Sequence, residues 1–195
     1  HASGFVSLVA PLVEDGLIAP ETALSCFSLT GYSGRKKKMI AEYESADRPA
    51  LLKGPRQYGL TQQHKHLKEM KALTGLDNPP IFCPIVSDFY SGMAVTVPLF
   101  KANLTEGKTV EDIIKTYKSL YNGSFVRYTE DLGEDAMLNA NALSVKDCME
   151  ITVQGNGERI LLIARYDNLG KGASGAAVEC LNILMGADPE TGLSL

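Results

Sequence analysis

The sequence predicts an α+β domain in which a mixed, largely antiparallel sheet carries helices on one face. Helical and strand-like segments follow each other without the regular β-α-β-α alternation of a doubly wound sheet. Two strand-like segments flank residues 155–158 (Gly-Asn-Gly-Glu), and an Asn-Gly pair at such a point is a strong signal for an antiparallel hairpin. The 195 residues, 45% of them hydrophobic, suffice for one substantial core.

Each element follows from the spacing of its apolar residues. Residues 4–16 repeat apolar side chains at helical intervals, and Ser3 is the candidate N-cap of that helix. Residues 93–100 alternate between two sets of side chains, as a strand does. The same reasoning predicts helices over residues 4–16, 65–73, 109–121 and 171–185, and strands over residues 23–30, 81–88, 93–100, 124–128, 148–154 and 159–166.

Residues 31–56 are polar and punctuated by glycine, and no regular element is predicted there. They include the basic run of residues 35–38 (Arg-Lys-Lys-Lys). Four adjacent cations are typical of a solvated surface, with anion binding as the alternative interpretation.

The bulk composition excludes some classes of partner. A net charge of −4 and a pI of about 5.4 give no support for nucleic-acid binding. No apolar run reaches the length of a transmembrane helix and no signal peptide is visible, so we expect no membrane partner and a cytoplasmic location. The chain begins with His1 instead of methionine, so we expect a processed or truncated start, or part of a longer chain.

The cysteines predict neither a disulfide framework nor a metal site. They are widely spaced, without a Cys-x-x-Cys pair, and each lies among apolar residues. We therefore expect four reduced, buried thiols, and no bound metal. A hydrolase that pairs one of them with a histidine is the alternative, and it needs an exposed thiol in electropositive surroundings. The four are Cys26, Cys83, Cys148 and Cys180.

Two of the three histidines, His64 and His66, lie in one short string with Glu69. Histidine is the side chain whose ordinary pKa is closest to neutrality, so such a string suggests proton transfer. A helix that starts near residue 65 disfavours an imidazolium at His64, whereas a nearby carboxylate favours it. These opposed effects would suit acid/base chemistry, and a plain polar surface helix is the other interpretation.

Residues 170–175 match the G-x-G-x-x-G pattern of dinucleotide sites, after a predicted strand and at the start of a predicted helix. That fingerprint also requires a second strand ending in an acidic residue about 20 residues later. Only helix and tail patterns remain after residue 175. We therefore expect a tightly packed helix start, close to a cofactor that another part of the protein holds.

Three separate motifs resemble those of N-acetyl-gamma-glutamyl-phosphate reductases. Residues 1–11 resemble the segment after the nucleophilic cysteine of that family, with His1 where Phe or Tyr is usual. Tyr58 followed by residues 64–69 resembles its aromatic residue and His-x-His-x-Pro-Glu block, with lysine in place of proline. Residues 167–175 resemble its Asp-Asn-Leu-x-Lys-Gly-Ala-x-Gly signature.

The resemblance covers essentially the whole chain and implies the C-terminal part of an NADP-dependent reductase, folded like the C-terminal domain of glyceraldehyde-3-phosphate dehydrogenase-like enzymes. It implies a catalytic and dimerisation domain over residues 1–165 and a helix over residues 166–195 that packs against an NADP-binding domain. The substrate would be a small acyl phosphate, and the assembly a homodimer or homotetramer. Because the nucleophilic cysteine of the family precedes the position of His1, the chain alone is expected to be inactive.

The resemblance also suggests roles for individual residues. It implies that His64 is the acid/base and that Glu69 orients it. An aspartate-semialdehyde dehydrogenase-like reductase and a non-catalytic oligomerisation module are the alternatives. The candidates for substrate binding are Ser3, Ser33, Gly34, Arg35, Tyr58 and His66, and those for cofactor binding are Asn168 and Gly172.

Overall fold

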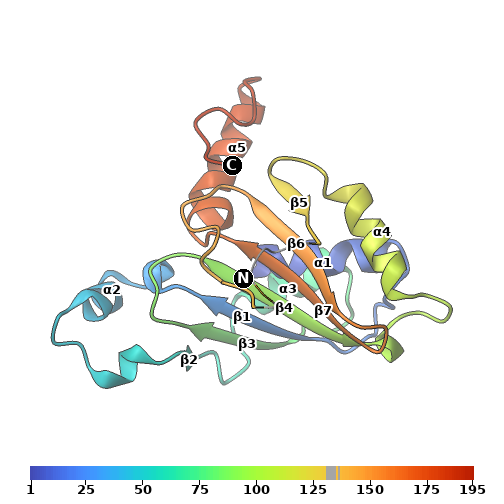
Figure 1. The fold of residues 1–195 in the computed structure, drawn as a ribbon, viewed down its shortest axis with the longest axis horizontal. Helices are drawn as coiled ribbons and strands as arrows, with labels where there is room; N and C mark the ends of the chain where they lie inside the picture. Colours follow the sequence, from blue (N-terminus) through green and yellow to red (C-terminus); the bar gives the residue numbers. More distant parts are fainter. Residues whose placement is uncertain (131–134, 136) are drawn as a thin grey trace.

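The computed structural model describes residues 1–130, 135 and 137–195, and its centre is one seven-stranded sheet (Figure 1). The strand order is β2-β3-β1-β4-β7-β6-β5. Only the pairs β1–β3 and β5–β6 are parallel, so the predicted mixed, largely antiparallel sheet is confirmed. The strands are β1 (Ser25–Thr30), β2 (Arg56–Gln57), β3 (Ile81–Val86), β4 (Met93–Phe100), β5 (Val126–Tyr128), β6 (Met149–Gly155) and β7 (Arg159–Tyr166).

Three helices pack on one face of this sheet and close the core. They are α1 (Ala2–Glu14), α3 (His66–Thr74) and α4 (Val110–Leu120). The strands alternate, so every second residue of β4 and β7 meets these helices, and Val95 and Leu162 are fully buried there. The phenol of Tyr117 on α4 donates a hydrogen bond to the carbonyl of Leu8, which ties α4 to α1 across the core.

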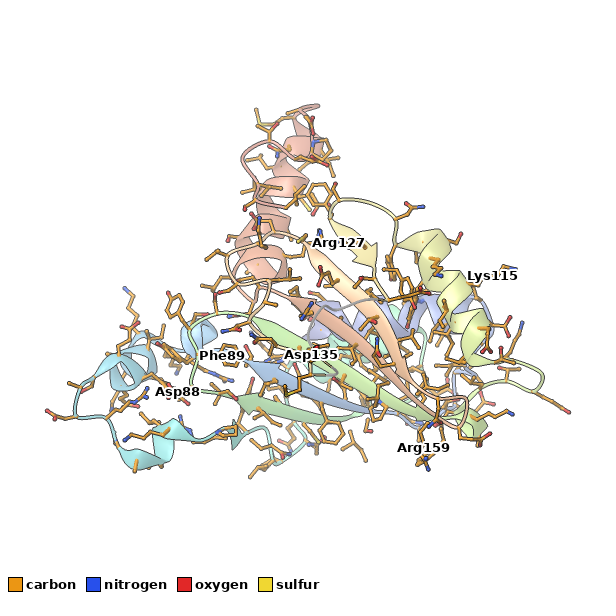
Figure 2. The ribbon with its side chains drawn as sticks, in the orientation of Figure 1. Asp88, Phe89, Lys115, Arg127, Asp135 and Arg159 are labelled. Carbon is orange, nitrogen blue, oxygen red and sulfur yellow. The ribbon has the colours of Figure 1, made fainter. Side chains whose placement is uncertain are left out.

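Two further helices lie outside this layer (Figure 1). Helix α2 (Lys37–Glu44) sits beyond the β2 edge, and α5 (Gly175–Leu184) extends away from the end of β7 after one π-helical turn (Gly170–Ser174). Arg48, which follows α2, donates two hydrogen bonds of 2.6 Å to Asp88 in the loop after β3. Figure 2 labels Asp88. None of the helices in the described part of the chain is long and apolar enough to cross a membrane.

The structure corrects four expectations. The first helix begins at Ala2, so Ser3 lies inside its first turn and is not its N-cap. Helix α2 was not predicted, because it buries only Tyr43 and its sequence has almost no apolar face. The hairpin of β6 and β7 is confirmed, but its positive φ (107°) belongs to Gly155 and not to the Asn-Gly pair. Cys180 is exposed and Cys83 half-buried, whereas the other two thiols are buried as expected.

None of the helices in the described residues covers the opposite face of the sheet. Phe27 on β1, Leu161 on β7 and Phe100 at the end of β4 point to this side and are 46%, 39% and 64% exposed. Near the carboxyl end of β7, residues 137–147 lie beside Arg165, which is buried and whose guanidinium donates a hydrogen bond to the carbonyl of Asn139. The face is therefore open and apolar over part of its area.

Candidate functional site

A pocket of about 270 Å³ lies where the amino end of α1, the carboxyl end of β1 and the start of α3 meet. Its wall draws on six separate parts of the chain, from His1 to the π-helical turn after β7. Both histidines of the predicted pair belong to it. The residues that line it are His1, Thr30, Gly31, Gly34, Arg35, Tyr58, His64, Lys65, His66, Met93, Asn168 and Gly172.

Seven of the ten residues predicted for the site therefore come together in this wall, although they span more than 130 positions of the sequence. They are Gly34, Arg35, Tyr58, His64, His66, Asn168 and Gly172. Ser3, Ser33 and Glu69 are not part of it. Ser3 is exposed on the first turn of α1, and Ser33 is buried behind the wall.

His64 lies just before Lys65, the N-cap residue of α3. Its Nδ1 accepts a hydrogen bond of 3.3 Å from the backbone N–H of His66, the first residue of that helix. A neutral ring that accepts at Nδ1 carries its proton on Nε2, so Nε2–H is the donor left for the pocket. Burial, and then the charges of Lys65, of the amino group of His1 and of Arg35, lower the pKa of His64. The ring is therefore neutral at pH 7 and presents a fixed hydrogen-bond donor.

His66 is the second neutral imidazole of the pocket. Its ring centre lies 4.8 Å from that of His64 and 5.6 Å from that of His1. Burial, together with the nearby amino group of His1, His64 and Lys65, lowers the pKa of His66 to about 4. Its Nδ1 is buried and has no hydrogen-bond partner among the described residues.

Arg35 supplies positive charge on the opposite side of the pocket. Its guanidinium carbon lies 3.8 Å from the centre of the Tyr58 ring, a close cation–π contact. Its Nη2 is buried and, in the described part of the chain, meets no hydrogen-bond acceptor. Buried polar atoms are almost always paired, so an unpaired guanidinium nitrogen and an unpaired imidazole nitrogen in one pocket wall indicate a place for a ligand with acceptor oxygens.

Glu69 does not pair with His64 as we expected. It is exposed on the first turn of α3, and its charge is not among those that act on His64. Among the described residues, no hydrogen bond or ion pair joins its carboxylate to His64. His64 lies outside α3, before the N-cap residue Lys65, so the two side chains do not follow one another along a single helix face.

Asn168 and Ser33 form a brace behind the pocket. The Asn168 side chain accepts a hydrogen bond of 2.9 Å from the backbone N–H of Gly92 and donates one of 2.8 Å to the hydroxyl of Ser33. It thereby links the end of β7 to the loop after β1 and to the residue that precedes β4. Ser33 is thus a structural partner of Asn168 and lies outside the pocket.

The glycines of the G-x-G-x-x-G match are explained by packing. A Cβ at Gly170 would lie 2.3 Å from the carbonyl oxygen of Lys146, and one at Gly175 would lie 2.1 Å from the carboxylate of Asp147. A Cβ at Gly172 would come within 3.0 Å of the carbonyl of Asp167. The π-helical turn therefore approaches the chain before β6 and the end of β7 too closely for side chains. This matches the tightly packed helix start that we expected.

His1 is the site residue whose contacts the sequence did not predict. Its Nδ1 is 2.5 Å from the hydroxyl of Ser28, and its Nε2 is 2.7 Å from the hydroxyl of Tyr58. The three residues come from α1, β1 and the segment after β2. The only sequence signal at position 1 was that histidine stands where the resembling family usually has Phe or Tyr.

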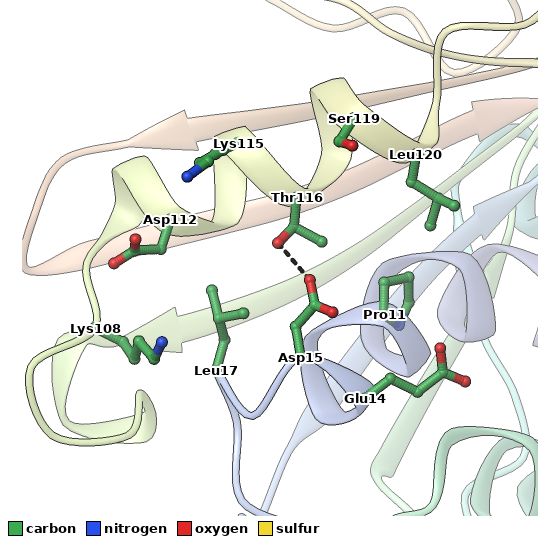
Figure 3. A pocket seen from close by; sticks show the side chains of 10 residues that line it. All are labelled: Pro11, Glu14, Asp15, Leu17, Lys108, Asp112, Lys115, Thr116, Ser119 and Leu120. Atoms are coloured by element: carbon green, nitrogen blue, oxygen red, sulfur yellow. Dashed lines mark hydrogen bonds between the residues drawn. The ribbon is translucent and has the colours of Figure 1, made fainter.

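A larger hollow of about 490 Å³ lies between the end of α1 and α4 (Figure 3). Its lining mixes acidic and basic side chains, and the hydroxyl of Thr116 donates a hydrogen bond of 2.7 Å to Asp15 across it. No lining residue of this hollow is a histidine or a cysteine. The smaller pocket is therefore the candidate site.

Neither a metal centre nor a cysteine nucleophile is supported within the described residues. No group of three or more acidic, histidine or cysteine side chains there could hold a metal ion. Cys26, the thiol on β1 near the pocket, is fully buried, and burial raises its pKa to about 12. It is therefore protonated and inaccessible at pH 7, which argues against Cys26 as the nucleophile of a Cys-His hydrolase.

Comparisons with known proteins find curated relatives of this chain. The N-acetyl-gamma-glutamyl-phosphate reductases of Sinorhizobium medicae and Rhizobium rhizogenes are 36% and 39% identical to this chain over 193 residues, which is 96% of the chain. The chain spans about 62% of the length of these relatives. The resemblance to this group of reductases is thereby confirmed.

Solved structures share the fold at low sequence identity. The aspartate semialdehyde dehydrogenase II of Vibrio cholerae superposes with a TM-score of 0.66 at 15% identity, over 95% of this chain and 61% of that one. A probable aspartate-semialdehyde dehydrogenase from Pseudomonas aeruginosa gives 0.67 at 16%, over 94% and 60%. A family model described as "Semialdehyde dehydrogenase, dimerisation domain" matches residues 1–168. The chain therefore belongs to the semialdehyde dehydrogenase dimerisation-domain family.

Proposed function

We propose that this chain is the catalytic and dimerisation part of an NADP-dependent reductase that converts N-acetyl-glutamyl 5-phosphate to N-acetyl-glutamate semialdehyde and phosphate. The observation that carries the proposal is the meeting of His64, Arg35 and the amino end of α1 in one pocket. The names of the relatives give the substrate class, since they are N-acetyl-gamma-glutamyl-phosphate reductases. NADP dependence and the cysteine mechanism rest on the resemblance.

In this proposal the nucleophile is a cysteine that directly precedes the position of His1 in the longer protein. Its thiolate adds to the acyl carbon and expels phosphate, which leaves a thioester. Such a thiolate would lie at the amino end of α1, where free N–H groups and the helix dipole favour an anion. Cys26, the buried thiol on β1, takes no part, because its pKa is raised to about 12.

His64 is the proposed proton donor in the second half of the reaction. NADPH, when bound, supplies the hydride that reduces the thioester. The Nε2–H of His64 protonates the oxygen that becomes negative at the former carbonyl carbon. His64 then takes this proton back as the C=O bond re-forms and the C–S bond breaks, which releases the semialdehyde and restores the cysteine thiolate. The backbone hydrogen bond from His66 to Nδ1 keeps the proton on Nε2, so the donor is set before substrate binds.

The cations of the pocket suit an acyl phosphate. Arg35 and Lys65 both line it, and the imidazoles of His64 and His66 are neutral at pH 7 because their pKa values are lowered. The net charge of these side chains is therefore positive, as the anionic oxygens of the substrate require. Asn168 and the π-helical turn at Gly172 are the wall residues that we propose to approach the nicotinamide.

The remaining surfaces fit the same whole protein. We propose that the open apolar face of the sheet joins two copies of the chain, as the name of the family model suggests. We also propose that α5 packs against an NADP-binding domain, with residues 1–165 as the catalytic and dimerisation domain. Leu181, Ile183 and Leu184 on α5 are 53%, 57% and 84% exposed, which gives that domain an apolar surface to cover.

The test is steady-state kinetics of the longer polypeptide that carries this chain, next to the isolated 195 residues. We expect NADPH-dependent reduction of N-acetyl-glutamyl phosphate by the longer protein and no turnover by the isolated chain. His64→Ala should lower kcat by roughly 10² or more. Turnover by the isolated chain, a near-normal rate for His64→Ala, or a preference for aspartyl phosphate would each contradict the proposal, and the last would favour the aspartate-semialdehyde alternative.

A further inference from the structure

The imidazole of His1 is held at both nitrogens. Nδ1 is 2.5 Å from the hydroxyl of Ser28, which is fully buried on β1, and Nε2 is 2.7 Å from the hydroxyl of Tyr58 beyond β2. The ring therefore bridges an inner strand of the sheet and a segment at its edge. With one ring nitrogen protonated, one of these bonds is donated by the imidazole and the other is accepted by it.

Tyr58 in turn carries the cation of the pocket. The Arg35 guanidinium lies face-on to the phenol ring at 3.8 Å, and its buried Nη2 has no acceptor among the described residues. A cation–π contact fixes the plane of the guanidinium only as well as the ring beneath it is fixed. The Tyr58 ring packs against the small cluster of Tyr43, Leu52 and Val86, and its hydroxyl is held by a hydrogen bond with His1.

We propose that His1 is a positioning residue, which holds Tyr58 and through it aims the Arg35 guanidinium at an anionic oxygen of the ligand. The inference deepens the proposed function and rests on it for identifying that oxygen as part of an acyl phosphate. The chain of contacts Ser28–His1–Tyr58–Arg35 stands independently of that identification.

A ring that only packs would not do this. His1 also lies against Phe82, with ring centres 5.4 Å apart, and phenylalanine at position 1 would keep such a contact. It would leave the hydroxyls of Ser28 and Tyr58 without their imidazole partner. The substitution His1→Phe therefore removes the two hydrogen bonds and keeps most of the packing, whereas His1→Gln retains one donor and one acceptor.

The experiment measures binding of inorganic phosphate to the 195-residue chain, released from a cleavable tag so that it begins at His1. Isothermal titration gives the affinity of the wild type and of His1→Phe, His1→Gln and Arg35→Lys. Losing hydrogen bonds that hold the guanidinium should weaken phosphate binding about three- to tenfold in His1→Phe, and His1→Gln should recover part of it. Arg35→Lys should weaken binding at least as much, because lysine cannot reproduce the planar contact.

A spectroscopic signature separates positioning from general stability. The ultraviolet titration of Tyr58, identified by its loss in Tyr58→Phe, should shift in His1→Phe and change less in His1→Gln. Tyr128→Phe removes a phenol on β5 away from the pocket and is the matched control for phosphate affinity, which it should not alter. Should His1→Phe fail to fold, His1→Gln and Tyr58→Phe supply the same comparison, since Tyr58→Phe cuts the chain of contacts at its next link.

Equal phosphate affinity in wild type and His1→Phe, or in wild type and Tyr58→Phe, would overturn the inference, as would no measurable phosphate binding by the wild type. In the longer protein, His1→Phe should raise KM for the acyl phosphate and leave kcat within about twofold. If the longer protein reduced no acyl phosphate while His1→Phe still weakened phosphate binding, the proposed function would fail and the positioning role would remain.

Discussion

Replacing Glu150 by glutamine should lower the free energy of unfolding by more than the partly exposed position of Glu150 on β6 would suggest. The Glu150 carboxylate lies between two arginines in a cross-strand row, with hydrogen bonds of 2.8 Å from Arg127 on β5 and from Arg165 on β7 (Figure 2 labels Arg127). The side chain of Arg165 is only 6% exposed, and that of Glu150 is 14% exposed. The substitution removes the negative charge that lies 2.8 Å from the buried guanidinium of Arg165.

The size of the effect follows from these burials. Breaking a buried ion pair on one side costs about 3–5 kcal/mol. Arg127 is 40% exposed and can turn to water, and Arg165 also donates to the carbonyl of Asn139. We therefore expect the lower end of that range, about 3 kcal/mol in the free energy of unfolding.

Urea unfolding of the 195-residue chain at pH 7 is the assay. Glu158→Gln is the matched control, because Glu158 is 75% exposed and lies 3.9 Å from Lys101, so its loss should change stability by less than about 0.5 kcal/mol. If the two variants unfolded at the same urea concentration, the argument from burial would be refuted.

The pH dependence of the same variant gives a second check. Burial works against ionisation of Glu150, but the hydrogen bonds and charges of Arg165 and Arg127 outweigh it and lower its pKa. A carboxyl whose pKa is lower in the folded state contributes stability above the pKa of the unfolded chain and loses it as the pH falls through the folded value. The difference between wild type and Glu150→Gln should therefore shrink in acid.

Three other outcomes are expected. Burial lowers the pKa of His66 to about 4, so between about pH 6.5 and 4 the unfolded chain binds more protons than the folded chain. The Tm should therefore fall as the pH is lowered through that window, and it should fall less in His66→Asn. An equal fall in both proteins would contradict this. Phe27→Glu on the open sheet face should shift the chain from dimer to monomer in light scattering, and an unchanged dimer would place the interface elsewhere. A thiol reagent should modify exposed Cys180 in the native chain and leave buried Cys26 unmodified until unfolding, and early labelling of Cys26 would contradict its burial.

Local patterns gave the sheet almost completely. The predicted strands over residues 93–100 and 159–166 agree with β4 and β7 to the residue. Side chains of a strand alternate between a buried and an open face, so their order in the sequence records the fold directly. Helix α2 left no such record, because it buries a single side chain against a small cluster and not against the main core.

The candidate site, like the fold, could be predicted from the sequence only in part. The motifs pointed to His64, His66, Tyr58 and Asn168, and all four line the pocket. Glu69, from the same motif, is exposed on α3 and does not line the pocket, because His64 lies before the helix and the two residues share no helix face.

The sequence by itself determined the sheet, its hairpin and the residue types of the pocket, because periodicity and spacing act between near neighbours. Only the tertiary structure decided what those residues do. His1 forms hydrogen bonds with Ser28 and Tyr58, which lie 27 and 57 positions away in the sequence. Asn168 and Ser33, also joined by a hydrogen bond, are 135 positions apart. Such contacts depend on where the sheet places distant segments. Among the described residues, one buried nitrogen of His66 and one of Arg35 have no hydrogen-bond partner, and we propose that a ligand binds there.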